Sequence, residues 1–192
     1  MSGSRPDEPM YKGAGVRSWL TALEALYGAE VARSTLAGGE PALREQIEQK
    51  RLSPSAWYPL AWYRSLHGVA QRVTGKGPAL SREVGAEAMR NDLSGIYRIF
   101  LVVVSPQAII SKSARLFNSF FTHGSSKVLE SRAGASRVRW EGCEGFDRNL
   151  WEDVLGSSEA SLALCGAKNI RIRYVEGGRD GDTSAELQVF WS

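Results

Sequence analysis

An α+β fold is predicted for this chain, with N-terminal helices packed on a C-terminal antiparallel sheet. Two patterns carry the prediction. Apolar residues recur at three- and four-residue spacing through the first two thirds of the chain, and they mostly alternate with polar residues in the last third. A run of helices followed by strand pairs is typical of α+β proteins. The sheet is expected to contain two hairpins joined by a crossover helix.

Five helices are predicted before the change of pattern. Pro41 and Pro59 suit the first turns of their helices, because proline needs no partner for its nitrogen there. Ser105 is an expected N-cap, with Pro106 at the first helical position. Gly124 fits a C-terminal stop. The predicted helices span residues 16–32, 41–50, 57–73, 81–104 and 106–123.

The last third is predicted to form four strands and one helix. Gly134 separates the first two alternating segments, which indicates a hairpin, and the glycine-rich connection 177–182 separates the last two. The expected strands span residues 126–132, 136–141, 169–176 and 185–191, with a helix at 146–155 between the hairpins.

One domain is predicted for residues 15–192, because a chain of 192 residues is long enough for a full core and short for two domains. Residues 1–14 are expected to be a disordered tail, since they begin with polar residues and two prolines.

The charge pattern argues against a nucleic-acid partner. The net charge is only +3, and charges of both signs are interspersed along most of the chain. The clearest basic cluster, Arg132, Arg137 and Arg139, is expected to be the solvent-facing side of a strand pair.

No apolar run approaches the length of a transmembrane helix, no signal peptide is evident, and two cysteines make no disulfide framework. A cytoplasmic location is therefore predicted.

Catalytic and metal-binding motifs are missing, so we expect no enzyme, no metal and no cofactor. His67 and His123 have no partner at metal-ligand spacing. His67 lies among aromatic residues on a predicted helix, where it is an alternative candidate for a haem ligand. Cys143 precedes a predicted helix, which makes it a second alternative, as a nucleophile or an acylated thiol, although Glu141 and Glu144 oppose thiolate formation.

The density of aromatic residues is the remaining functional signal. Such residues can form a core, an interface with another subunit, or an apolar ligand pocket. Four of them fall within seven residues and cannot all face one side of a helix. The candidate ligand-binding residues are Trp57, Tyr58, Trp62, Tyr63, Phe117, Phe120 and Phe121.

Several segments resemble a family of proteins of about this length and unknown function that is expanded in myxobacteria. They are the sequence SAWYPL at 55–60, GIYRIF at 95–100, VSP at 104–106, the glycine after FFTH at 120–123, and a closing strand that ends at Trp191. The resemblance covers residues 16–191. It implies no catalytic residues.

The C-terminal half is more remotely similar in layout to a superfamily of ligand-binding domains in nitric-oxide signalling and Golgi transport. Its members include haem nitric-oxide sensors, vinyl-reductase-type sensors and TRAPP tethering subunits. The resemblance implies an apolar pocket between helices and sheet, and frequent dimers. This sequence lacks the Tyr-x-Ser-x-Arg motif of the haem branch and the cysteines of the vinyl-reductase branch in hairpin 170–191.

Together these observations predict a non-catalytic sensory or scaffold module. It is expected to bind an apolar small molecule or a protein partner, as a homodimer. The alternatives are a cysteine-dependent enzyme or acylated adaptor using Cys143, and a haem-based sensor using His67.

Overall fold

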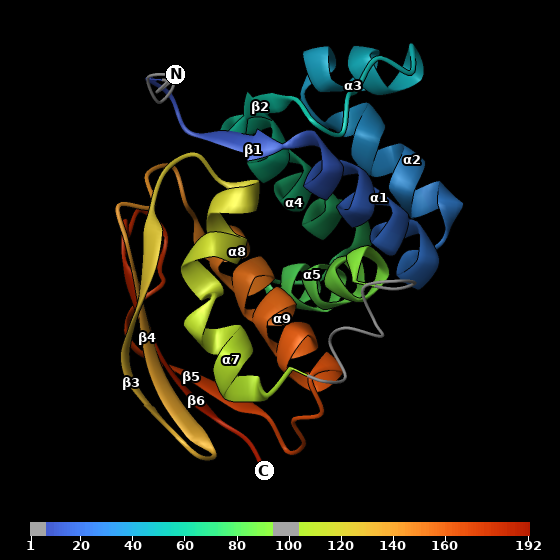
Figure 1. Cartoon of the computed structure of the whole chain (residues 1–192). Coiled ribbons are helices and arrows are strands. Elements are labelled where there is room, and N and C mark those ends of the chain that lie inside the picture. The colour runs from blue at the N-terminus through green and yellow to red at the C-terminus, as the bar shows by residue number, and fades with distance from the viewer. Residues whose placement is uncertain (1–6, 94–103) are drawn as a thin grey trace.

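The computed structural model describes residues 7–93 and 104–192, and it confirms the α+β fold (Figure 1). The first half of the chain is helical, apart from a short pair of strands. Its elements are β1 (Met10–Lys12), α1 (Gly13–Tyr27), α2 (Ala29–Gly38), α3 (Pro41–Glu48), β2 (Trp57–Pro59), α4 (Leu60–Thr74) and α5 (Ala79–Asp92).

The second half supplies the sheet and the helices beside it. Its elements are α7 (Pro106–Ser111), α8 (Ser113–Phe120), β3 (Ser125–Arg132), β4 (Ala135–Glu141), α9 (Arg148–Leu164), β5 (Arg171–Gly177) and β6 (Ala185–Phe190). The strand order is β3-β4-β6-β5, with every pair antiparallel. The sheet thus contains the two predicted hairpins, with α9 between them in sequence. Figure 1 shows α7, α8 and α9 on the sheet face that is turned toward the helical half.

The two faces of the sheet differ in chemistry. The inner face carries apolar pairs such as Val138 opposite Leu187 and Trp140 opposite Ala185. The outer face carries ion pairs, which include Arg137 Nε to Glu186 at 2.8 Å. Two members of the predicted basic cluster, Arg137 and Arg139, thus form ion pairs with carboxylates on this face.

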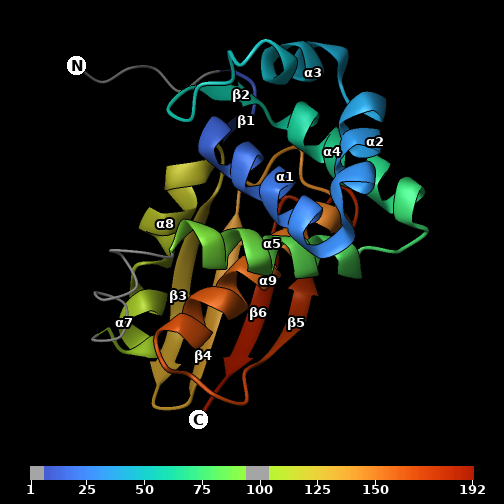
Figure 2. The same cartoon turned by 90° about the vertical axis from the view of Figure 1, so that its right-hand side faces the viewer.

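Helix α5 is the layer that joins the two halves. It lies between α1 and α9 (Figure 2), and it crosses α9 so closely that two glycines are required. A Cβ atom on Gly156 would lie 2.0 Å from the carbonyl oxygen of Arg82, and one on Gly85 would lie 2.2 Å from Asp153 Oδ1. The missing side chains let the two helix backbones approach each other.

The N-terminal prediction needs two corrections. The predicted tail 1–14 includes strand β1 and the start of α1, and Tyr11 is buried. The helix predicted from Trp57 begins at Leu60 instead. Trp57–Pro59 forms β2, which pairs with β1 in antiparallel register. Pro59 adopts an extended backbone (φ −50°, ψ 129°) that ends the strand and precedes the helix.

Four helix predictions have the right location and different bounds. The helix predicted at 16–32 is divided at Gly28, whose φ of 89° is incompatible with a continuous helix. The helix predicted at 81–104 spans Ala79–Asp92, and the rest of that prediction falls largely outside the described residues. The helix after Pro106 is divided at Lys112, with Ser105 as its N-cap as predicted. The crossover helix α9 continues beyond the predicted end to Leu164.

Among the described residues, no helix is both long and apolar enough to cross a membrane.

Candidate ligand-binding cavity

A cavity of about 110 Å³ lies where α5 and α9 meet α7, α8 and the inner face of the sheet. Its wall is mostly apolar. Val138 and Val189 contribute from the sheet, and Ala88 and Val154 contribute from the central helices. Among the described residues, six aromatic side chains line it, namely Tyr11, Tyr63, Phe117, Phe120, Phe121 and Trp140.

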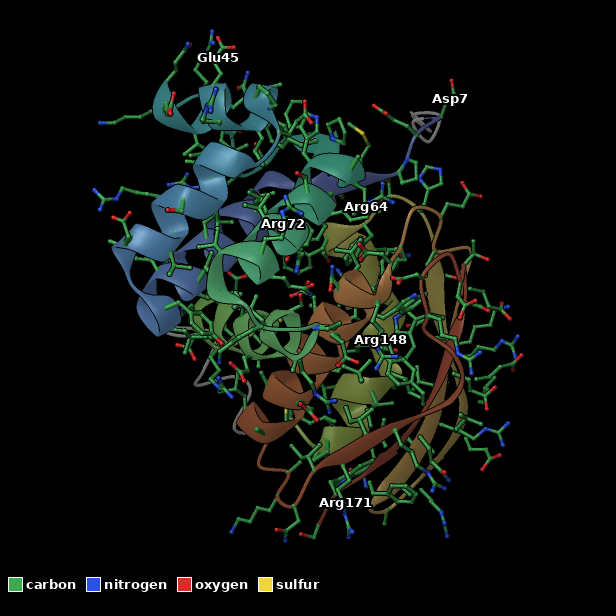
Figure 3. The ribbon with its side chains drawn as sticks, turned by 180° about the vertical axis from the view of Figure 1, so that it is seen from behind. Asp7, Glu45, Arg64, Arg72, Arg148 and Arg171 are labelled. Atoms are coloured by element: carbon green, nitrogen blue, oxygen red, sulfur yellow. The ribbon has the colours of Figure 1, made fainter. Side chains whose placement is uncertain are left out.

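Arg148 lies on the other side of the helix–sheet junction. Seen from behind (Figure 3), it lies between α9 and the sheet. Its guanidinium lies 4.6 Å from the ring centre of Tyr174, and it donates to the carbonyl oxygen of Gly178 at 3.2 Å. These contacts stabilise the junction on that side without contributing to the cavity wall.

Four of the seven predicted ligand-binding residues line this cavity. They are Tyr63 on α4 and the three phenylalanines Phe117, Phe120 and Phe121 on and after α8. Phe117 and Phe121 are one helical turn apart, and their rings stack at 4.6 Å between centres. The structure thus brings together two aromatic groups that are more than fifty positions apart in sequence.

Trp57, Tyr58 and Trp62 do not line the cavity. Trp57 lies under the ammonium group of Lys12, 4.1 Å from the ring centre, and Tyr58 packs beside Trp62. The Tyr58 hydroxyl oxygen accepts a hydrogen bond from the backbone N–H of Ser53 at 2.8 Å. These residues stabilise the β1–β2 pair and the start of α4.

Tyr11, Tyr63 and Asp153 form a polar cluster in the cavity wall. The rings of Tyr11 and Tyr63 stack at 3.9 Å, and the Tyr63 hydroxyl donates to Asp153 Oδ2 at 3.0 Å. Asp153 is only 4% exposed. Burial raises the pKa of its carboxyl group to about 7, against the opposing effect of the Tyr63 hydrogen bond. Burial also raises the pKa of both tyrosines well above the usual value, so their hydroxyl groups stay neutral.

Three polar lining residues, Tyr11, Asp92 and Asp153, were not predicted from the sequence. Tyr11 fell within the predicted tail, and its burial follows from the strand pairing of β1, which no periodicity in three residues can reveal. Asp153 did leave a signal. It lies one helical turn after Leu150, which is fully buried on α9, so a carboxylate was placed on a core-facing side of a predicted helix.

His67 lies outside the cavity wall. It is fully buried, its Nδ1 forms a hydrogen bond with the Ser81 hydroxyl at 2.8 Å, and its ring packs against Trp19. Burial lowers the pKa of His67 to about 3, so the imidazole is neutral at physiological pH. His123 is half-buried beside Thr122. Among the described residues, no group of three His, Cys, Asp or Glu side chains could hold a metal ion.

Cys143 does not have the environment of a reactive thiol. It is fully buried, and burial raises its pKa to about 12. It also lies five residues before the start of α9, beyond the first helical turn.

We therefore expect neither Cys143 nor Cys165, which is also buried, to react with Ellman's reagent in the native chain. Both should react after unfolding in guanidinium, which serves as the control. Rapid reaction of one thiol in native wild-type chain, lost in Cys143→Ala, would contradict the burial and restore the cysteine-dependent alternative.

No protein-family model matches the sequence, and no curated protein matches it. Solved structures do match. The Fe(II) unliganded H-NOX protein from K. algicida is 11% identical, with a TM-score of 0.68 over 94% of this chain and 96% of that one. A variant of the T. tengcongensis H-NOX is 17% identical, with a TM-score of 0.68 over 94% and 97%. The chain has the H-NOX fold.

A third neighbour extends the likeness to a protein described by its haem. That structure concerns the modulation of haem redox potential by protein-induced porphyrin distortion. It is 18% identical and has a TM-score of 0.68 over 93% of this chain and 99% of that one. This fold agrees with the remote similarity in layout that the sequence predicts. It supplies no support for the family that shares the Trp-Tyr-Pro sequence.

Proposed function

We propose that this chain is a sensory module whose small-molecule ligand occupies the aromatic cavity between the helices and the sheet. The observation that carries the proposal is the cavity itself. It is largely apolar, a few polar groups such as Asp153 and Tyr63 are placed among its aromatic rings, and it lies where the two halves of the fold meet. A ligand there would contact α5 and α9 together with α8 and the sheet, so its binding could change how the two halves pack.

The size of the cavity limits the ligand. A cavity of about 150 Å³ lined by apolar side chains is large enough for benzene. At about 110 Å³, this cavity is somewhat smaller, so side chains must move outward to admit a ligand that contains one aromatic ring.

A cavity-filling variant tests this proposal. Ala88 lines the cavity, so Ala88→Leu should reduce its volume, and Ala61→Leu is the matched control on the exposed side of α4. We expect small aromatic compounds to raise the melting temperature of the wild type and of Ala61→Leu, and to have little effect on Ala88→Leu. Equal shifts in all three proteins would place binding elsewhere.

Native mass spectrometry of the purified chain gives an independent readout. A retained mass that disappears in Ala88→Leu supports the proposal. The same spectrum reports the oligomeric state, so it also tests the homodimer and the protein partner, which remain predictions.

Haem-based sensing is the second candidate, and the comparisons favour it over a haem-free ligand. The neighbours are named as H-NOX proteins, and one is described by its haem. The described residues of this chain do not fit that group well. His67, the alternative candidate for a haem ligand, is outside the cavity wall, and a porphyrin is far larger than the cavity.

We expect haem reconstitution to separate these candidates. If His67 ligated haem iron, mixing with hemin would give a sharp Soret band that His67→Gln abolishes. Glutamine is chosen because its side-chain amide can keep a hydrogen bond to Ser81. The packing of His67 predicts that any Soret band is the same in wild type and His67→Gln. A band lost only in the variant would establish haem sensing through His67.

A further inference from the structure

The cavity wall has an unbalanced charge. The described lining residues include two carboxylates, Asp92 on α5 and Asp153 on α9, and no lysine, arginine or histidine. Asp92 accepts a hydrogen bond from the Ser18 hydroxyl. Asp153 is the more deeply buried of the two, and it accepts a hydrogen bond from a neutral group, the Tyr63 hydroxyl. A buried carboxylate is costly unless a cation or several donors stabilise it.

The aromatic rings of the cavity wall also favour a positively charged ligand. Phe121 lies 4.8 Å from Tyr11 between ring centres, and Tyr11 stacks on Tyr63, so the rings lead from the phenylalanine wall to Asp153 without interruption. The faces of aromatic rings carry negative potential and attract cations, which is the basis of aromatic cages for ammonium groups. The Asp153 carboxylate and the rings along the walls together favour a positively charged ligand.

We infer that the ligand is a small apolar molecule with a protonated amine, whose ammonium group pairs with Asp153 and whose apolar body packs among the aromatic rings of α8. This inference rests on the proposed function and specifies its ligand class. A carboxylate ligand is disfavoured, because Asp92 and Asp153 would repel it in a poorly solvated site. A neutral ligand would fill the space and leave the Asp153 carboxylate without a cation.

Among the described residues, three titratable groups line the cavity with Asp153 and can modify this pairing. They are Tyr63 on α4, Tyr11 on β1 and, more distantly, Asp92 on α5. The tyrosines stay neutral across the physiological range, so the charge contributed by the described lining residues depends on the two carboxylates.

Calorimetric titration with three compounds of one size tests the inference. The probes are benzylamine, benzyl alcohol and benzoate, at pH 7.5 and moderate salt. We expect benzylamine to bind the wild type at least tenfold more tightly than benzyl alcohol, and benzoate to bind more weakly than both. Asp153→Asn should weaken benzylamine at least tenfold and change benzyl alcohol by less than about twofold.

A matched variant controls for the loss of one negative charge. Glu24→Gln removes a carboxylate from the exposed side of α1 and should leave all three affinities unchanged. If Asp153→Asn fails to fold, two measurements on the wild type still test the inference. They are the order of the affinities of the three probes and the pH dependence of benzylamine binding. That affinity should rise between pH 5.5 and 8 as Asp153 ionises.

The outcomes separate the inference from the proposed function. Equal binding of benzylamine and benzyl alcohol, both lost in Ala88→Leu, would overturn the amine and leave the cavity as a ligand site. Binding of none of the probes to the wild type, with no retained ligand in its mass spectrum, would overturn both. Preference for benzylamine that Asp153→Asn does not change would also overturn the assignment to Asp153.

Discussion

Gly156→Ala is expected to destabilise the chain by at least about 2 kcal/mol, because an added methyl group at a close helix crossing forces the backbones apart. The new Cβ would lie 2.0 Å from the Arg82 carbonyl oxygen and 3.0 Å from the Ala86 nitrogen. Both are backbone atoms of α5 and cannot rotate away, as a flexible side chain could. For a chain of this size, such a loss lowers the melting temperature by about 4–8 °C.

The same substitution elsewhere should have the opposite sign. Gly68 lies within α4, and its nearest neighbour to an added Cβ is the end of the Arg72 side chain at 3.6 Å. Gly68→Ala should therefore stabilise the chain by about 0.5–1 kcal/mol, the usual gain from replacing glycine inside a helix. Urea unfolding of both variants measures the contrast. An unchanged or increased stability in Gly156→Ala would show that the α5–α9 crossing is not tight.

Asp153→Asn is expected to stabilise the chain at pH 8 and to give little or no gain at pH 4. Asparagine keeps an oxygen that accepts from the Tyr63 hydroxyl, and it removes the cost of burying a charge. The cost is reflected in the pKa of Asp153, which burial raises to about 7. A shift of three units corresponds to about 4 kcal/mol, so we expect a gain of about 2–4 kcal/mol.

The pH window follows from the direction of the shift. Below about pH 4, the carboxyl group is protonated in the folded and the unfolded state and makes no difference. Between about pH 4 and pH 7, the unfolded state releases the proton and the folded state keeps it, so wild-type stability falls as the pH rises. Above about pH 7, both states are ionised and the penalty is constant.

His67 acts in the opposite direction over an overlapping range. Its folded pKa is lowered to about 3, so the folded chain loses stability as the pH falls below the unfolded value of about 6.5. The wild-type curve therefore mixes two opposing slopes. The difference between wild type and Asp153→Asn, measured by urea unfolding from pH 4 to pH 8, isolates the carboxyl group. A difference that does not change with pH would contradict the burial of an ionisable Asp153.

The fold could be predicted where local patterns decide structure. The change from helical to alternating periodicity located both hairpins, and the Ser105–Pro106 sequence located the start of α7, because capping and alternation are properties of neighbouring residues. The β1–β2 pair could not be predicted in this way. It joins Tyr11 to Tyr58 across forty-six intervening residues, and a three-residue strand carries no periodic signal.

The candidate site was predicted only in part for the same reason. The phenylalanines and Tyr63 stand out as aromatic clusters in the sequence, and the fold directs them to one cavity. The Trp57–Tyr63 segment changes from strand to helix at Leu60, so Trp57 and Tyr58 lie on a different element from Tyr63. This change decides which of its aromatic residues face the cavity. The pairing of Tyr63 with Asp153 joins residues ninety positions apart, and only the tertiary structure reveals it.

A crystal structure of the wild-type chain with benzylamine would locate the ligand directly. We expect density for the ring among Phe120, Phe121 and Trp140, with the amine nitrogen within hydrogen-bond distance of the Asp153 carboxylate. Density for the compound outside this cavity, or an unchanged cavity at saturating concentration, would show that the cavity is not an amine-binding site.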